Sequence, residues 1–140
     1  RLACLPWLDD PGIEGEIAVA RAAILRQGFG GSHCLCHGDL GNLDVLLEMG
    51  RRLGDAELLA RVPRIAAGVL RGIEERGWLT GALRSPEIPG LFTGLAGIGY
   101  QLLRLAAVEE VPSVLLLEPP RASGKGLQAA ERAGRRESRW

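Results

Sequence analysis

Apolar residues return every three or four positions in four separate stretches of this chain, which is the spacing of a buried helix face. The first stretch starts at Asp10 and Pro11, where aspartate can cap the first turn and proline has no N–H to leave unpaired. Isoleucines at helical spacing carry it to Gly28, where we expect it to end. The apolar residues 1–8 before it are predicted to be the end of an earlier helix.

Two more helices are predicted in the middle of the chain. Leucines within residues 42–52 indicate the second, and Gly54 is expected to stop it. Asp55 is expected to cap a third, longer helix that reaches Gly77. Pro63 lies inside this pattern and predicts a kink or a later start, because proline cannot donate a helical hydrogen bond. The apolar stripe of the third helix comprises Leu58, Val62, Ile65, Ala66, Val69 and Ile73.

The last third of the chain is rich in glycine and proline. A polar loop is expected from Trp78 to Pro89, and the glycine-rich residues 90–100 lead into three leucines that predict a fourth helix. Residues 111–117, bounded by prolines, are expected to form a short extended or irregular plug. Residues 121–140 are basic and poor in apolar side chains, so we predict that they are disordered. The pattern as a whole is that of an all-α domain over residues 1–120.

The chain contains an internal repeat. The Gly-x-x-Gly turn at 38–41 aligns with another at 94–97, and this offset of 56 residues also aligns Leu46-Leu47 with Leu102-Leu103. Each copy is a loop, a glycine turn and an apolar helix, which predicts stacked helical hairpins. Because a helical glycine costs about 1 kcal/mol relative to alanine, we expect a backbone or a helix to approach these glycines closely. Chance similarity between glycine-rich helix starts is the alternative.

Residues 32–42 hold both histidines and two of the three cysteines of the chain, directly before a predicted helix. Thiolate sulfur and neutral imidazole are the ligands that zinc prefers. The spacing Cys34-x-Cys36-His37 is followed by no second ligand pair, so a closed four-ligand site is not expected. The alternative is that Cys34 and Cys36 are small buried apolar residues and that His33 lies on the surface. The second copy of the repeat has neither residue type at these positions.

Composition limits the compartment and the partners. The chain is neutral overall, but residues 121–140 carry six Lys/Arg and two Asp/Glu. No aromatic or helical pattern accompanies this charge, so we expect no nucleic-acid partner. Three cysteines cannot pair completely, which favours a reducing, cytoplasmic compartment, and no secretory or membrane segment is recognisable, so no membrane partner is expected. The chain begins at Arg1 rather than Met, and we expect it to be part of a longer protein.

Three blocks of this chain together resemble the C-terminal cyclase domain of class II lanthipeptide synthetases, in the lanthionine synthetase C-like family. The blocks are 36–42 (CHGDLGN), 89–100 (PGLFTGLAGIGY) and 111–120 (VPSVLLLEPP). They occur in the family's order, and the resemblance covers residues 1–120. It implies the C-terminal portion of an α/α toroid, two nested rings of helices, truncated at its N-terminal side.

The resemblance also implies a catalytic zinc held by two cysteines and one histidine. The family's adjacent Cys-His pair corresponds to Cys36 and His37, and the third ligand is expected upstream of Arg1. Cys4 lacks the Trp and Gly that flank the family's other zinc cysteine, and Cys34 stands where the family often has a small polar residue, so neither is assigned as a ligand.

The implied reaction is the formation of a thioether ring in lantibiotic biosynthesis. A cysteine thiol of a bound precursor peptide adds to a dehydroalanine or dehydrobutyrine, and coordination to zinc deprotonates that thiol. The acid that protonates the enolate formed by this addition is left open between His33, the zinc-bound histidine and a histidine upstream. Of these, His33 is the candidate catalytic residue near the Cys36-His37 pair. Asp39 either orients the imidazole of His37 or caps the following helix, and the cap is the favoured interpretation.

The expected partners are the precursor peptide, the upstream remainder of the toroid and a dehydratase domain. Without a third metal ligand, the chain alone is expected to be inactive. One alternative is a non-catalytic helical scaffold or a peptide-binding remnant. Another is a different enzyme on the same toroid, but glycosidase chemistry needs paired carboxylates, and Asp9, Asp10 and Asp39 give no convincing pair. Prenyl transfer to a thiol also uses zinc, with a ligand set that normally includes an aspartate.

Overall fold

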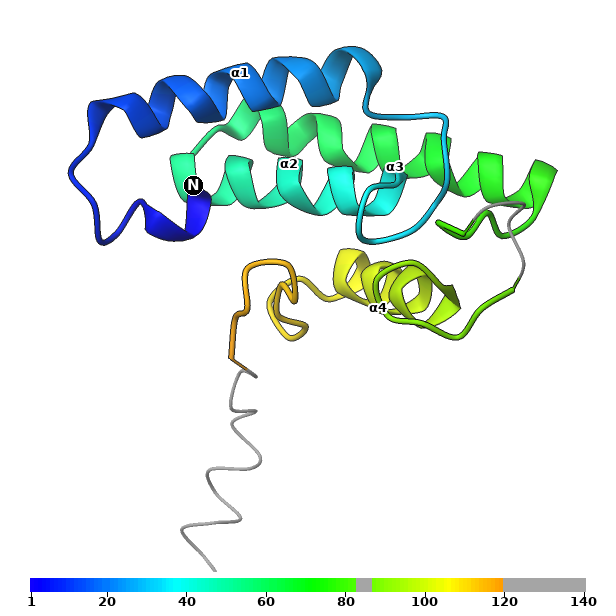
Figure 1. Cartoon of the computed structure of the whole chain (residues 1–140). Helices are drawn as coiled ribbons and strands as arrows, with labels where there is room; N and C mark the ends of the chain where they lie inside the picture. Colours follow the sequence, from blue (N-terminus) through cyan, green and yellow to red (C-terminus); the bar gives the residue numbers. More distant parts are fainter. Residues whose placement is uncertain (83–86, 120–140) are drawn as a thin grey trace, which may run out of the picture.

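The computed structural model describes residues 1–82 and 87–119, and these residues form helices and turns without a strand. A 3₁₀ turn, η1 (Leu2–Cys4), is followed by the helices α1 (Pro11–Gln27), α2 (Asp39–Leu53), α3 (Ala56–Arg76) and α4 (Leu95–Ala106) (Figure 1). The predicted all-α fold is confirmed for this part of the chain. The helix expected before residue 8 is a single 3₁₀ turn, and the predicted disorder of residues 121–140 falls outside the described residues.

The predicted caps of α1 and α3 are confirmed. Asp10 accepts a hydrogen bond from the backbone N–H of Gly12 at 2.8 Å, with Pro11 as the first helical residue. Asp55 likewise accepts from the N–H of Leu58 at 2.8 Å. Each bond satisfies one of the N–H groups that a first helical turn leaves unpaired. Both helices therefore begin at the residues that the sequence indicates.

The predicted ends of the helices are confirmed as well. Gly54 ends α2 with φ +66°, in the left-handed region that favours glycine, and Gly77 ends α3 with φ +77°. Because the chain turns sharply at Gly54, α2 and α3 form an antiparallel hairpin (Figure 1). None of the described helices is both long enough and apolar enough to cross a bilayer.

One predicted helix start is wrong, and one alternative for another helix does not occur. The second helix begins at Asp39 rather than at Asn42, because the turn before it already bonds the N–H of Asp39 to the carbonyl of Ser32 at 2.8 Å. The third helix begins at Ala56 and runs through Pro63, so the later start does not occur. The cap at Asp55 fixes the start about two helical turns before the proline. Residues 107–119 are turns and irregular chain, as the plug interpretation expected.

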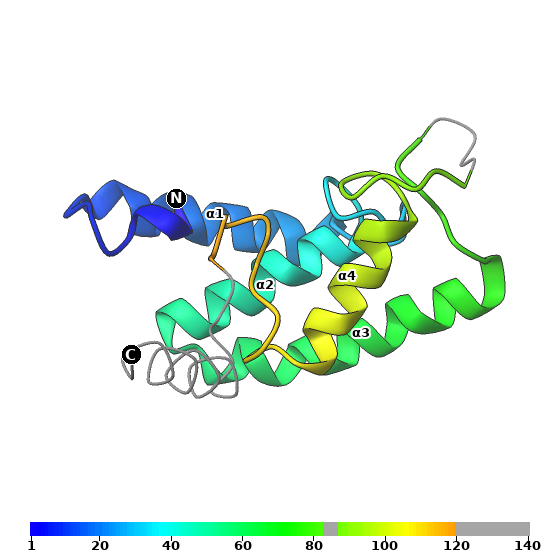
Figure 2. The ribbon, with the colours of Figure 1, turned by 90° about the horizontal axis from the view of Figure 1, so that it is seen from below.

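Helix α2 lies at the centre of the fold. It contacts α1, α3 and α4, with α1 on one side of the α2–α3 hairpin and α4 crossing the other (Figure 1, Figure 2). Ten of its fifteen residues are buried, whereas α3 buries only a stripe of four. A helix that is covered on most sides belongs to the inside of a larger assembly of helices. The core residues of α2 are Leu40, Leu43, Leu46, Leu47 and Met49.

The internal repeat is present in the structure. The bond between Asp39 N–H and the carbonyl of Ser32 recurs 56 residues later between Leu95 and Ile88, also at 2.8 Å. The glycine before each helix, Gly38 or Gly94, is the N-cap and has an extended backbone. Both helices therefore start from the same folded turn.

The helical glycines of the repeat have the close backbone neighbours that we expected. A Cβ added at Gly41 would lie 2.0 Å from the carbonyl oxygen of Leu35, and one at Gly97 would lie 1.6 Å from that of Leu91. In each copy the neighbour is the backbone of the preceding turn. Only glycine lets the turn fold back against its own helix at this distance.

Substitution of Gly97 by alanine should be strongly destabilising, by about 3 kcal/mol, because its Cβ would meet fixed backbone rather than a movable side chain. Gly99→Ala is the matched control in the same helix. No atom lies within 4 Å of its added Cβ, so it should raise the free energy of unfolding by about 0.5–1 kcal/mol. Urea unfolding of both variants measures the difference, and equal effects would contradict the close packing.

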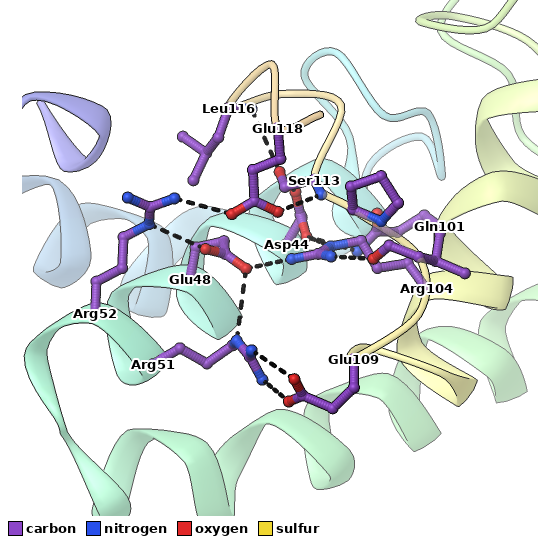
Figure 3. Close-up of polar contacts among 12 residues, drawn as sticks. Asp44, Glu48, Arg51, Arg52, Gln101, Arg104, Glu109, Ser113, Leu116 and Glu118 are labelled. Atoms are coloured by element: carbon purple, nitrogen blue, oxygen red, sulfur yellow. Dashed lines mark hydrogen bonds and ion pairs between the residues drawn. The ribbon is translucent and has the colours of Figure 1, made fainter. Parts of the chain in front are cut away.

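A buried network of charged side chains joins α2 to α4 and to the segment after it (Figure 3). Arg104 of α4 is fully buried, and its guanidinium pairs with Asp44 at 2.6 Å and with Glu48. The second carboxylate oxygen of Asp44 accepts from the hydroxyl of Ser113 at 2.7 Å. Glu118 accepts from the N–H of Ser113 at 2.8 Å. These bonds hold residues 113–118 against the hairpin.

Removal of the buried Arg104 guanidinium should destabilise the fold. We expect Arg104→Leu to lower the free energy of unfolding by about 3–5 kcal/mol, because it leaves Asp44 and Glu48 buried without their counter-charge. Arg61→Ala breaks an exposed i, i+4 pair with Glu57 and should cost less than about 0.5 kcal/mol. Urea unfolding compares the two, and a small effect at Arg104 would show that the network does not stabilise the fold.

Candidate functional site

Three loops meet at one end of α2 and α4. They are residues 28–38, which lead into α2, residues 77–82, which follow α3, and residues 88–94, which lead into α4 (Figure 1, Figure 2). The N–H of Cys36 donates to the carbonyl of Phe92 at 2.8 Å. The N–H of Gly81 donates to the carbonyl of Thr93 at 2.7 Å. The loop of the second repeat copy therefore supports both other loops through its backbone.

Cys36 and His37 lie in the turn immediately before α2, and both side chains are exposed. Cys36 is a free thiol, and neither side chain forms a hydrogen bond with any residue in the described ranges. The turn itself is held by its backbone, since the N–H of Gly38 donates to the carbonyl of Cys34 at 3.2 Å. A thiol and an imidazole with unused donor atoms on a fixed turn fit two of the ligands of a zinc ion.

The described residues do not supply the rest of a metal site. No group of three His, Cys, Asp or Glu side chains in residues 1–82 and 87–119 comes together in a way that could hold a metal ion. Zinc sites in enzymes usually combine three protein ligands with one open position. A zinc site at Cys36 and His37 therefore needs at least one ligand from outside the described residues.

The other two cysteines have different environments. Cys34 is fully buried, and its sulfur accepts a hydrogen bond from the hydroxyl of Ser32 at 3.3 Å. Cys4 is half-buried and packs against the hydrophobic core from the N-terminal 3₁₀ turn. The alternative interpretation of small buried cysteines is therefore right for Cys34 and wrong for Cys36, whose side chain the turn exposes.

His33 is buried rather than on the surface, because it joins two loops. The ring Nδ1 of His33 accepts a hydrogen bond from the backbone N–H of Leu79 at 3.0 Å. The backbone N–H of His33 donates to the carbonyl of Leu79 at 2.7 Å. Burial lowers the pKa of His33 below its usual value of 6.5, the Asp39 carboxylate raises it in part, and Arg76 lowers it further. The ring is therefore neutral near pH 7 and, with Nδ1 accepting, carries its proton on Nε2. Among the described residues, Nε2 has no hydrogen-bond partner.

Asp39 does not cap α2, and its side-chain hydrogen bonds within the described residues go to the preceding loop rather than to His37. The N-cap is Gly38, where an added Cβ would lie 2.4 Å from the carbonyl oxygen of Ser32, so an aspartate cannot occupy the cap position. Asp39 is instead the first helical residue. Its buried carboxylate accepts from the backbone N–H groups of Gly30 and Gly31, at 3.0 and 3.3 Å. It therefore orders the loop before the turn, and its charge lies at the positive end of the helix dipole.

Sequence reasoning missed two residues that shape this site. Leu79 provides both backbone bonds to His33, and Gly81 lies directly between the side chains of Cys34 and His37. Both lie in the loop after α3, where no periodic pattern indicates which residues face inward. Asn42, part of a block that the sequence analysis did single out, ties the loop to α2 through a 2.6 Å bond to the carbonyl of Gly28.

Comparison with known proteins identifies one family. The family model described as lanthionine synthetase C-like protein matches residues 1–116, which is most of the chain. Neither the curated proteins nor the solved structures gave a match.

Acid should destabilise the fold through His33. Unfolded histidine takes up a proton near pH 6.5, whereas the folded state resists it, so stability is fully present above that pH and falls as the pH drops toward the lowered folded pKa. The loss should approach about 1.4 kcal/mol per pH unit for one proton. We expect the unfolding free energy to fall more steeply between about pH 7 and about pH 5 than in His33→Gln. Equal slopes in urea unfolding would contradict a neutral buried imidazole.

Proposed function

We propose, because this chain belongs to the lanthionine synthetase C-like family, that it is part of a zinc-dependent cyclase that forms thioether rings in a lantibiotic precursor peptide. The observation that carries this proposal is the exposed, adjacent pair Cys36 and His37 on a turn held by backbone bonds. The all-helical fold and the buried inner helix α2 agree with the C-terminal portion of an α/α toroid.

In the proposed reaction, a peptide cysteine adds across the double bond of a dehydroalanine or dehydrobutyrine. The sulfur bonds to the β-carbon, the π bond breaks, and a proton is added at the α-carbon. One thiol proton is released and one proton is taken up, so no oxidant or reductant is needed. A bound zinc would supply a peptide thiolate near neutral pH by lowering the pKa of a coordinated thiol.

The residues of this chain have defined roles in that scheme. Cys36 and His37 would hold the metal with their side chains, which the turn leaves exposed before α2. His33 is the candidate acid near this pair, but its full burial and its bond to Leu79 favour a structural role. We therefore look for the proton donor among residues that face the substrate, including His37 and residues outside the described ranges.

The finer features of the function are also part of the proposal. The three blocks that resemble class II lanthipeptide synthetases support that class, a precursor peptide as substrate, and a dehydratase domain in the same protein. Three free thiols suit the reducing conditions of the cytoplasm. The third zinc ligand is proposed to lie before Arg1, in the remainder of the toroid.

Metal titration tests the proposal. A longer protein that includes the residues encoded before Arg1 should bind one zinc ion tightly, and the 140-residue chain should bind it weakly. Loss of a residue that only orients a metal ligand typically weakens metal binding about 10–100-fold. In the longer protein, Cys36→Ala or His37→Ala removes a ligand itself and should therefore weaken zinc binding by more than this. Cys4→Ala is the control, because this thiol packs against the core and should leave affinity unchanged.

The same experiment distinguishes the proposal from the main alternative. If the longer protein binds no zinc, or if Cys36→Ala and His37→Ala bind it as tightly as the parent, the chain is a helical scaffold or a peptide-binding remnant. Ring formation on a dehydrated precursor peptide, followed by mass spectrometry after thiol alkylation, should fail in the same two variants and persist in Cys4→Ala.

A further inference from the structure

The loop after α3 passes through a narrow gap at Gly81. A Cβ added there would lie 2.8 Å from the sulfur of Cys34 and 2.9 Å from Cε1 of the His37 ring. Both distances are shorter than the contacts that real Cβ atoms make, so a side chain at Gly81 would collide with both Cys34 and His37. The Cε1 edge of the exposed His37 imidazole thus faces the side of Gly81 where a Cβ would stand.

Of the two side chains at Gly81, only that of His37 is free to move. Cys34 is fully buried, its sulfur is bonded to the hydroxyl of Ser32, and its carbonyl accepts from the N–H of Gly38. His37 is exposed and makes no hydrogen bond with the described residues. Any atom added at Gly81 therefore displaces the ring of His37 first.

The loop that carries Gly81 is fixed from both sides. Two hydrogen bonds join Leu79 to the buried His33, and the N–H of Gly81 donates to the carbonyl of Thr93. The anchor at His33 comes from the loop before α2, and the anchor at Thr93 comes from the loop before α4. A loop that is held at Leu79 and at Gly81 itself is a fixed surface for the imidazole.

We propose that Gly81 is a positioning residue that sets the orientation of the His37 imidazole, with His33 as the clamp that holds the loop in place. This inference rests on the proposed function, in which His37 is a metal ligand. Partners that orient a ligating histidine keep its ring nitrogen directed at the metal, and their loss typically weakens metal binding about 10–100-fold. Here the orienting partner is a backbone contact that glycine alone permits.

The contact itself can be tested without metal in the 140-residue chain. The chain has two histidines, so the two Cε1–H signals in an NMR spectrum are assigned with His33→Gln and His37→Gln. We expect a strong nuclear Overhauser effect between the α-protons of Gly81 and the Cε1 proton of His37. Gly81→Ala should shift the His37 signal, and Gly31→Ala, whose added Cβ meets no atom within 4 Å, should not. Absence of the Overhauser effect overturns the proposal.

The effect on the metal is measured in the longer protein by competition with a chromophoric zinc chelator. We expect Gly81→Ala to weaken zinc binding about 10–100-fold while Gly31→Ala leaves it unchanged. Cobalt substitution should show altered visible bands in Gly81→Ala, since the geometry at the histidine changes. Unchanged affinity and unchanged bands in Gly81→Ala overturn the proposal.

A second variant separates orientation from general damage to the fold. Adding Cys34→Ala to Gly81→Ala removes the sulfur on the other side of the gap, so the loop can shift away from His37 and affinity should largely return. A double variant no better than Gly81→Ala contradicts the proposal. If His37→Ala also leaves zinc affinity intact, the proposed function itself fails; if only Gly81→Ala does so, the function stands and the positioning role fails.

Discussion

The close approach of the backbone to the first turns of α2 and α4 is the constraint on which the rest of the structure depends. At Gly41 and Gly97 there is no room for a side chain between the helix and the turn that precedes it. Each turn therefore packs directly on its own helix, and Leu35 is fully buried, with its Cβ 3.2 Å from the position that a Cβ at Gly97 would occupy. Leu35 and Cys34 are buried in this turn, whereas the next two residues, Cys36 and His37, are exposed.

The helices of the two copies, α2 and α4, are joined by charge as well as by apolar packing. Arg104 contacts two carboxylates one helical turn apart on α2 and also the carbonyl of Val111. Buried ionic groups stabilise a fold only when their hydrogen bonds are satisfied, and here acceptors from two elements surround one guanidinium. Because the same network bonds Ser113, the segment after α4 cannot leave without exposing or unpairing buried charge.

The copies share a geometry and differ in chemistry. The first exposes a thiol and an imidazole, and the second has Phe92 and Thr93 at the same positions. The second copy acts through its carbonyl groups, which hold the backbone at Cys36 and Gly81. The second copy thus supports the backbone, and the first copy carries the candidate ligands. This division of roles explains how the short loop around Gly81 is ordered next to exposed reactive side chains.

Much of the fold follows from the sequence because it is local. Aspartates at helix starts, glycines after helix ends and the glycine repeat act over a few residues, and the structure places all of them as predicted. The family also follows, because it is carried by contiguous blocks. The start of α2 was missed by three residues, since only the folded turn shows that Gly38 takes the cap and Asp39 bonds to the glycines before it.

Contacts between distant segments were decided by the tertiary structure alone. Nothing near His33 in the sequence indicates that its ring is buried against Leu79, 46 residues away. In the same way, the pairing of Arg104 with Asp44 joins residues 60 positions apart, and Gly81 meets His37 only because α3 returns the chain to the start of α2. The sequence by itself determined where α1 and α3 begin, where α2 and α3 end, and which residues are candidate metal ligands. The environment of each side chain depends on how whole helices pack, and no short stretch of residues specifies that packing.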